Sequence, residues 1–140
     1  MSNGGAPGEE CIVQHAIWTG TEMVLWCGNI PPHGARYDPK TDTWRVVSLQ
    51  GAPMYESSMA PVWTGREMVV LGSLAESSGR YDPESDTWHE IPPNRGLAQR
   101  TGAALVWDGT GVLEWGGAGT GFVGTEFVFG DGFRYIPPGN

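Results

Sequence analysis

Short apolar stretches separated by polar turns run through most of the chain. From Cys11 the sequence reads CIVQHAIW, then TGTE, then MVLWCG, which predicts a strand, a tight turn and a second strand. Gly20 would supply the backbone angle that the turn needs. The same phrase returns as MAPVW, TGRE, MVVLG from Met59 and as GAALVW, DGTG, VLEWGG from Gly102. The pattern therefore predicts three related β-hairpins.

A second phrase follows the first two hairpins. YDPKTDTW at 37–44 and YDPESDTW at 81–88 each place an aromatic residue on either side of a polar turn. The proline presets a turn angle, and the aspartates accept hydrogen bonds from nearby backbone N–H groups. In the third unit we expect this second hairpin in FVFGDGFRY at 127–135, with Phe133 in the place of the tryptophan. The two phrases together predict units of four antiparallel strands.

The landmarks of these units keep a nearly constant period. Trp18, Trp63 and Trp107 lie 45 and 44 residues apart, and the two Tyr-turn-Trp phrases lie 44 apart. A period of about 40 to 50 residues fits the four-stranded blade of a β-propeller. Both faces of the predicted second strands are apolar, as in MVLWC from Met23 to Cys27, so each sheet has to be covered on both sides. Stacked blades meet that requirement.

The units resemble kelch repeats. An apolar strand, a turn, a second strand ending in Gly-Gly, then Tyr, a turn and Trp is similar to the kelch pattern, and WTGxEMVVxG is similar to kelch-type repeats of bacterial proteins. The Gly-Gly pair is intact only at 116–117 and reads Cys-Gly and Leu-Gly in the first two units. The resemblance covers about 11–136. It implies an all-β kelch-type β-propeller, with the WD40-like arrangement of four-stranded antiparallel blades around an axis.

The number of repeats and the lack of apolar periodicity before them predict how the chain is divided and assembled. We expect a flexible leader at 1–10 and a three-blade half-propeller at 11–140, with blades near 11–50, 54–95 and 98–138. Three blades cannot close a ring, and apolar faces of the end blades would be open to water, with Leu25, Trp26 and Trp115 among the side chains. We therefore expect a homodimer that forms a six-bladed ring with twofold symmetry. The alternative is a fragment of a longer propeller.

Composition and charge limit the classes of partner that the protein can bind. The 22 Gly, 11 Pro and 7 Trp fit many short strands joined by tight turns. A net charge of −8 repels a phosphate backbone, so we expect no nucleic acid partner. We find no apolar stretch long enough to span a membrane and no signal-peptide pattern, which predicts a soluble, cytoplasmic protein with no membrane partner. The two cysteines are predicted to be small apolar core residues rather than a disulfide or a zinc site.

Binding is expected on the loops that vary between units. The TGxE and DPxxDT turns fall at one end of the blades and are nearly identical, whereas the second-to-third-strand loops and the blade connectors gather at the other end and vary. The candidate binding residues there, whose alternative is an ordinary solvated loop role, are His33, Tyr55, Glu56, Arg95, Gln99, Arg100 and Phe122.

Three charged residues stand on strands rather than loops. Glu114 takes the inward position held by Leu25 and Val70 in the other units, so it should be paired or have a raised pKa. We expect an internal ion pair for Glu114; the alternative is a polar group in a ligand cavity, which makes it a further binding candidate. Arg36 and Arg80 recur with the motif tyrosine, and we expect each to pair with an acidic residue of its own blade, such as Glu22 or Glu67; the alternative is that they bind a ligand.

No catalytic motif stands out. The sequence has no GxSxG elbow, P-loop or dinucleotide fingerprint, and its three histidines have no second ligand at metal-site spacing. We expect no metal, no cofactor and no catalytic residue. The first hypothesis is a non-catalytic module that binds a peptide, protein or glycan through the variable loop face. The alternative is a small carbohydrate-processing enzyme with a site at the propeller axis, since some bacterial kelch proteins that this chain resembles act on sugars such as sialic acid, as epimerases or mutarotases.

Overall fold

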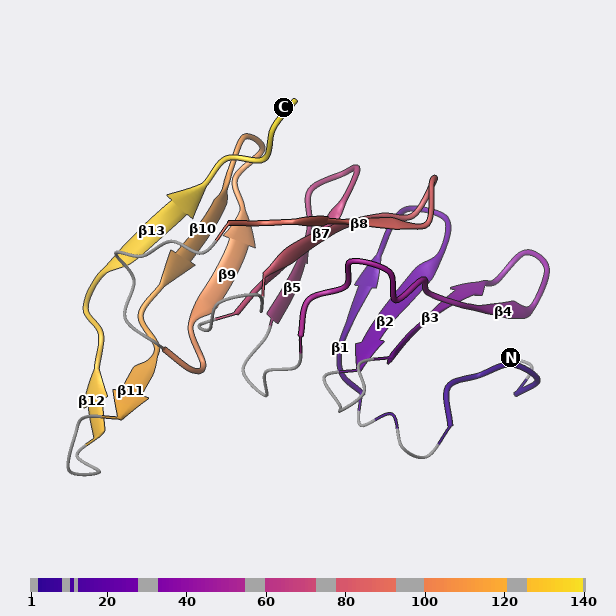
Figure 1. The fold of residues 1–140 in the computed structure, drawn as a ribbon, viewed down its shortest axis with the longest axis horizontal. Coiled ribbons are helices and arrows are strands. Elements are labelled where there is room, and N and C mark those ends of the chain that lie inside the picture. The colour runs from indigo at the N-terminus through magenta and orange to yellow at the C-terminus, as the bar shows by residue number, and fades with distance from the viewer. Residues whose placement is uncertain are drawn as a thin grey trace.

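The computed structural model describes residues 3–8, 11, 13–27, 33–54, 60–72, 78–92, 100–120 and 126–139. All regular elements within these ranges are β-strands, which confirms the all-β prediction. Sheet 1 is antiparallel in the order β1-β2-β3-β4, with strands at Val13–Trp18, Met23–Cys27, His33–Asp38 and Thr43–Val46. Sheet 2 has the same order in β5-β6-β7-β8, with strands at Ala60–Trp63, Met68–Leu71, Gly79–Asp82 and Thr87–Glu90. Figure 1 shows the sheets side by side in chain order.

Sheets 1 and 2 share one strand register. The four residues that lie across from one another are Trp18, Met23, Tyr37 and Trp44 in sheet 1 and Trp63, Met68, Tyr81 and Trp88 in sheet 2. The tyrosine hydroxyls donate to Asp42 and Asp86 over 2.5 Å, and both aspartates have positive φ values, of 53° and 55°. The two predicted Tyr-turn-Trp hairpins are therefore confirmed, each closed by a contact between its tyrosine and its turn.

Sheet 3 differs from the prediction. It has three strands within the described residues, in the order β13-β10-β9, at Gly132–Tyr135, Val112–Trp115 and Ala104–Trp107. A separate pair, β11 (Ala118–Thr120) and β12 (Glu126–Val128), lies between β10 and β13 in the chain and extends away from sheet 3 (Figure 1).

The predicted hairpin at 127–135 is therefore wrong. Tyr135 pairs with Val112, as Tyr37 pairs with Met23, so the tyrosine and not Phe133 marks the register. The physical reason is that Gly130-Asp131-Gly132 leads from one pair of strands to another instead of closing a turn. A third whole four-stranded unit is likewise not found among the described residues, which include no strand after β13.

The core lies between the sheets. One cluster joins sheets 1 and 2 and includes Val24, Trp26, Met68, Val70 and Trp88. A second joins sheets 2 and 3 and includes Val69, Leu71, Val112, Phe133 and Tyr135. Sheet 2 is thus covered on both faces, as the apolar run of β6 predicts. The first strands are neighbours, with β1 beside β5 and β5 beside β9.

Three side chains were predicted to lie on the exposed outer faces of the end blades, and the prediction is correct for only one of them. Trp115 is 63% exposed, but Leu25 and Trp26 are only 8% and 4% exposed. Trp26 is covered because its ring packs against Trp88 of sheet 2. Leu25 lies on the opposite face of β2, where it is buried together with Cys27.

Residues 3–8 contact the outer strand of sheet 1. The connector between sheets 1 and 2 contacts the outer strand of sheet 2 in the same way. A Cβ atom built on Gly5 would lie 3.4 Å from the Trp44 Cβ, and one on Gly51 would lie 3.4 Å from the Trp88 carbonyl oxygen. Both glycines have positive φ and begin a Gly-Ala-Pro sequence. The alanine N–H of each donates to a carbonyl oxygen three residues back over 3.2 Å. Flexibility of 1–10 stays a prediction, but residues 3–8 have this defined contact.

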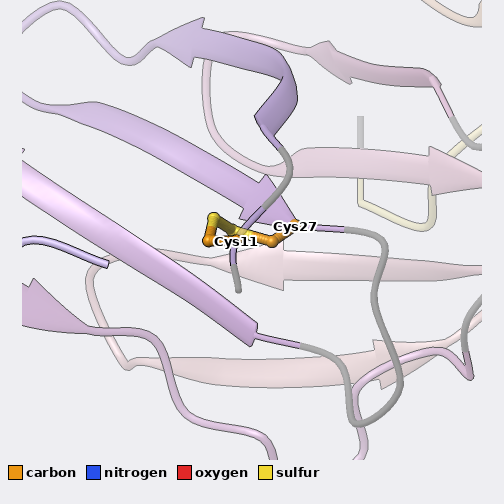
Figure 2. The surroundings of a disulfide bond; sticks show 2 residues. All are labelled: Cys11 and Cys27. Atoms are coloured by element: carbon orange, nitrogen blue, oxygen red, sulfur yellow. A yellow bond between two sulfur atoms is a disulfide. The ribbon is translucent and has the colours of Figure 1, made fainter. Parts of the chain in front are cut away.

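The two cysteines form a disulfide, so their interpretation as unpaired core residues is wrong. Figure 2 shows the bond between Cys11 and Cys27, whose Cα atoms are 5.3 Å apart. Cys27 ends β2 and pairs with Val13, which brings Cys11 into reach because it precedes β1 by two residues. Disulfides are typical of oxidising compartments. The cytoplasmic location stays a prediction. Across the described ranges, no helix is long and apolar enough to span a membrane.

Candidate functional site

A cleft of about 230 Å³ lies at the turn end of sheets 1 and 2. The β1–β2 turn forms one wall, and the β5–β6 and β7–β8 turns form the other. The lining residues are Thr19, Thr21, Glu22, Trp63, Gly65, Arg66, Pro83 and Glu84. Binding was predicted at the opposite end, on the loops that vary, so the sequence did not point to this cleft.

The walls of the cleft are fixed by threonine side chains. Thr19 Oγ1 accepts the N–H of Glu22 over 2.9 Å and donates to the carbonyl oxygen of the same residue over 3.1 Å. Thr64 does the same for Glu67, over 3.0 Å and 3.1 Å. Gly20 and Gly65 have positive φ at the next position, which a side chain would strain. Each TGxE turn is therefore held in shape by hydrogen bonds within the turn.

Two arginines, one buried and one half-buried, bind the glutamates of the two TGxE turns. Arg80 Nη1 bonds both carboxylate oxygens of Glu67 over 3.1 Å and 3.0 Å, which confirms the predicted pair within one unit. Arg36 Nη1 lies 3.7 Å from Glu22 Oε2, as predicted, and also donates to the Pro83 carbonyl oxygen of the neighbouring sheet. Glu22 accepts a further bond of 2.6 Å from Arg45.

Arg36 therefore joins sheet 1 to sheet 2, whereas Arg80 joins parts of sheet 2. Among the residues that the structure describes, the buried Nε atoms of Arg36 and Arg80 have no hydrogen-bond partner. Burial and the hydrogen bond to Asp86 raise the pKa of Tyr81, which packs into the same junction.

The chemistry of the cleft is that of a small polar binding site. Its wall offers the hydroxyl groups of Thr19 and Thr21, the exposed charges of Arg66 and Glu84, and the Trp63 side chain. Within the ranges that the structure describes, no three His, Cys, Asp or Glu side chains lie close enough to hold a metal ion. The predicted lack of a metal, a cofactor and catalytic residues stays a prediction.

Three of the predicted binding residues are described, and they are not all loop residues. His33 begins β3, half-buried, opposite Cys27. Glu114 is half-buried in β10 between Leu105 and Phe133, in the position predicted for it; its ion pair stays a prediction. His33 and Glu114 belong to sheets that sheet 2 separates. The other candidates, Tyr55, Glu56, Arg95, Gln99 and Phe122, lie outside the described residues.

Arg100 is buried rather than solvated, with 6% of its surface exposed. Its guanidinium donates to the carbonyl oxygens of Gly116 and Asp131 and to the Asp131 carboxylate, over 3.0 to 3.1 Å. It also lies over the Phe129 ring, 4.3 Å from the centroid. These contacts tie the start of sheet 3 to the β12–β13 connection. Its role in binding stays a prediction.

The structure adds an exposed apolar hairpin that sequence reasoning missed. All three side chains of β12 are exposed, and Val128 is 83% exposed. The Phe127 ring packs edge-on against Phe129 with centroids 5.0 Å apart. The apolar run FVF at 127–129 was a signal for this strand, but it was assigned to a different partner.

Comparison of the sequence with protein-family models gives no match, and comparison with curated proteins gives none. The resemblance to kelch repeats therefore rests on the landmark residues of the chain itself. The structure supports the coarser description, an all-β protein with several antiparallel sheets, two of which have four strands.

Proposed function

We propose that the chain is a non-catalytic interaction module built as an arc of kelch-type propeller blades. The shared register of sheets 1 and 2 and the place of Tyr135 in sheet 3 support one repeated plan. The adjacent first strands β1, β5 and β9 support a common axis, because propeller blades meet along their innermost strands. Apolar clusters between successive sheets support stacking of one blade on the next.

The loop face recognises its ligand through the β11–β12 hairpin. The carrying observation is that Phe127 and Val128 stand exposed on a hairpin that projects from sheet 3 (Figure 1). The hairpin joins the second and third strands of that sheet, so it belongs to the end where the loops vary. Among the three ligand classes, exposed apolar side chains favour a peptide or protein over a glycan.

A peptide library and a glycan array, screened with the full chain, test this function. The informative variant is Phe127→Ser with Val128→Ser, and the matched control is Val46→Ser, an exposed valine on β4 of sheet 1. We expect hits in the peptide library that the double variant loses and the control keeps. Hits that survive the double variant, or sugar hits alone, would contradict the assignment to this hairpin.

A second copy of the chain completes the ring in this proposal. On sheets 1 and 2, Val24 and Val69 face the next sheet and are fully buried. Leu113 holds the same register position in sheet 3, where it is exposed together with Trp115 and Val106. These three side chains form the open face of sheet 3. Its natural cover is a sheet like sheet 1 or sheet 2, and the particle mass in solution tests whether another copy supplies it.

A further inference from the structure

The outer edge of β13 lacks the strand that closes the other sheets. In sheets 1 and 2 the strand with the motif tyrosine lies between the second and fourth strands of its sheet. In sheet 3 the corresponding strand, β13, pairs with β10 on one side and with no described strand on the other. Sheet edges of this kind are templates for another strand.

Sheets 1 and 2 show which strand fits such an edge. Each outer strand begins at the threonine of an Asp-Thr-Trp sequence, at 42–44 and 86–88, and the aspartate is the last residue of the turn before it. The tryptophan packs on the tyrosine across from it, with centroids 4.9 Å and 5.1 Å apart. The aspartate accepts the tyrosine hydroxyl, and the residue three after the tryptophan, Val47 or Ile91, is buried in the core.

Tyr135 presents one half of this contact. It packs half-buried in the cluster between sheets 2 and 3, in the register of Tyr37 and Tyr81. No described residue hydrogen-bonds its hydroxyl, whereas the hydroxyls of Tyr37 and Tyr81 each have an aspartate. Ile136, the next residue, is exposed. Tyr135 thus supplies the tyrosine side of this contact. The described residues include no outer strand that would supply the tryptophan and the aspartate.

We propose that the outer edge of β13 binds an extended peptide segment that begins Asp-Thr-Trp and carries an aliphatic residue three positions after the tryptophan. The segment adds antiparallel to β13, with its tryptophan across from Tyr135 and its aspartate accepting the Tyr135 hydroxyl. Main-chain bonds along β13 give the affinity, and these side chains give the specificity. This inference rests on strand register and does not depend on the proposed ring or on the β11–β12 hairpin.

A second copy of this chain does not fit the edge as well as a separate peptide segment does. The chain has two Asp-Thr-Trp sequences, and both already pair within their own sheets, β4 with β3 and β8 with β7. A copy would have to release one of these paired strands from its own sheet before donating it. The occupant is therefore a segment whose Asp-Thr-Trp sequence is not yet paired.

The test is binding of a labelled synthetic peptide to the full chain. The peptide TDTWRVVS copies 41–48, and its anisotropy is followed as protein is added. We expect saturable binding that weakens by roughly tenfold or more when the peptide tryptophan becomes alanine, because the buried aromatic anchor is lost. A scrambled peptide is the control. No binding up to about 1 mM, or equal binding of the scrambled peptide, would overturn the proposal.

A double-mutant cycle locates the contact. Tyr135→Phe in the protein and Asp→Asn in the peptide should each weaken binding by roughly tenfold, and the two together by little more than either alone, since both remove the same charge-assisted hydrogen bond. Additive effects would place the peptide elsewhere. The wild-type protein with the altered peptide gives a readout that does not depend on the folding of the variant.

The particle mass separates this proposal from the ring. The peptide should leave the mass of any dimer unchanged, because the edge of β13 and the open face of sheet 3 are different surfaces. Dissociation of a dimer by the peptide would show that a second copy occupies the edge and would overturn the proposal. Peptide binding to a monomer would support the edge and reject the ring.

Discussion

The Trp26 ring of sheet 1 packs against the Trp88 ring of sheet 2, with the centroids 4.5 Å apart. Trp88 also packs on Tyr81 of its own sheet, and its Nε1 donates to the carbonyl oxygen of Ser48 over 2.9 Å. One outer-strand side chain therefore holds its own sheet, the neighbouring sheet and the connector between them.

Trp88→Ala should destabilise the protein by about 3 to 5 kcal/mol, the usual cost of removing a large buried aromatic side chain. Trp44→Ala is the matched comparison, and it should cost less because Trp44 is only half-buried. Urea denaturation of both variants measures the difference. Equal losses, or a Trp88 variant as stable as the parent, would show that the junction between the sheets does not depend on this ring.

Reduction of the Cys11–Cys27 bond should lower the free energy of unfolding by about 3 kcal/mol, because the bond closes a short loop in the unfolded chain. Denaturation with and without a thiol reductant measures the loss. The Cys11→Ser variant should be less stable than the oxidised parent and should not respond to the reductant. A parent that is equally stable in both conditions would contradict the disulfide.

The buried pair between Arg80 and Glu67 should behave differently from the exposed contact of Arg45. Glu67→Gln should cost about 3 to 5 kcal/mol, because a buried guanidinium loses its counter-charge. Arg45→Ala should cost about 0 to 1 kcal/mol, since its side chain is 56% exposed. Adding Arg80→Met to Glu67→Gln should recover part of the loss. Chemical denaturation of these three variants and of Arg80→Met alone measures the losses. If the double variant loses as much as the sum of Glu67→Gln and Arg80→Met, the pairing is contradicted.

Stability should fall above about pH 10, and Tyr81 should contribute to that fall. The pKa of Tyr81 is raised from its ordinary value of 10.0, first by burial and then by Asp86. The stability that Tyr81 contributes is fully present below its pKa in the unfolded chain. It is lost as pH rises from there toward its pKa in the folded chain, because in that window only the unfolded chain loses the phenol proton. Urea titrations at pH 8 to 11 should show a shallower fall for Tyr81→Phe. Identical slopes would mean that the phenol is solvated.

The recurring phrases of the first two units were sufficient to predict the strands of sheets 1 and 2. Their apolar phrases recur with the same turn residues, and each turn is closed by contacts within one hairpin. The third unit was misread because Phe133 and Tyr135 are both aromatic and both follow a glycine-rich turn. Only the pairing of Tyr135 with Val112 decides between them, and that pairing is a contact distant in sequence.

The disulfide and the cleft were missed for related reasons. Cys11 and Cys27 meet because β1 and β2 pair, so a cysteine count alone does not reveal the bond. The cleft arises where the turns of two sheets face each other, and nothing in either turn alone indicates it. Arg100 was instead predicted as a binding residue because it lies next to a variable loop. In the structure its side chain is buried and donates hydrogen bonds to backbone carbonyl oxygens.

The open face of sheet 3 is the central claim of the proposed assembly, and particle mass tests it most directly. Gel filtration with light scattering at micromolar concentration should give a mass near twice the 15.1 kDa of one chain. Trp115→Ser should lower the mass toward that of one chain without loss of folding, because the side chain is 63% exposed in the single chain. A well-folded parent with a mass of 15.1 kDa would contradict assembly through this face.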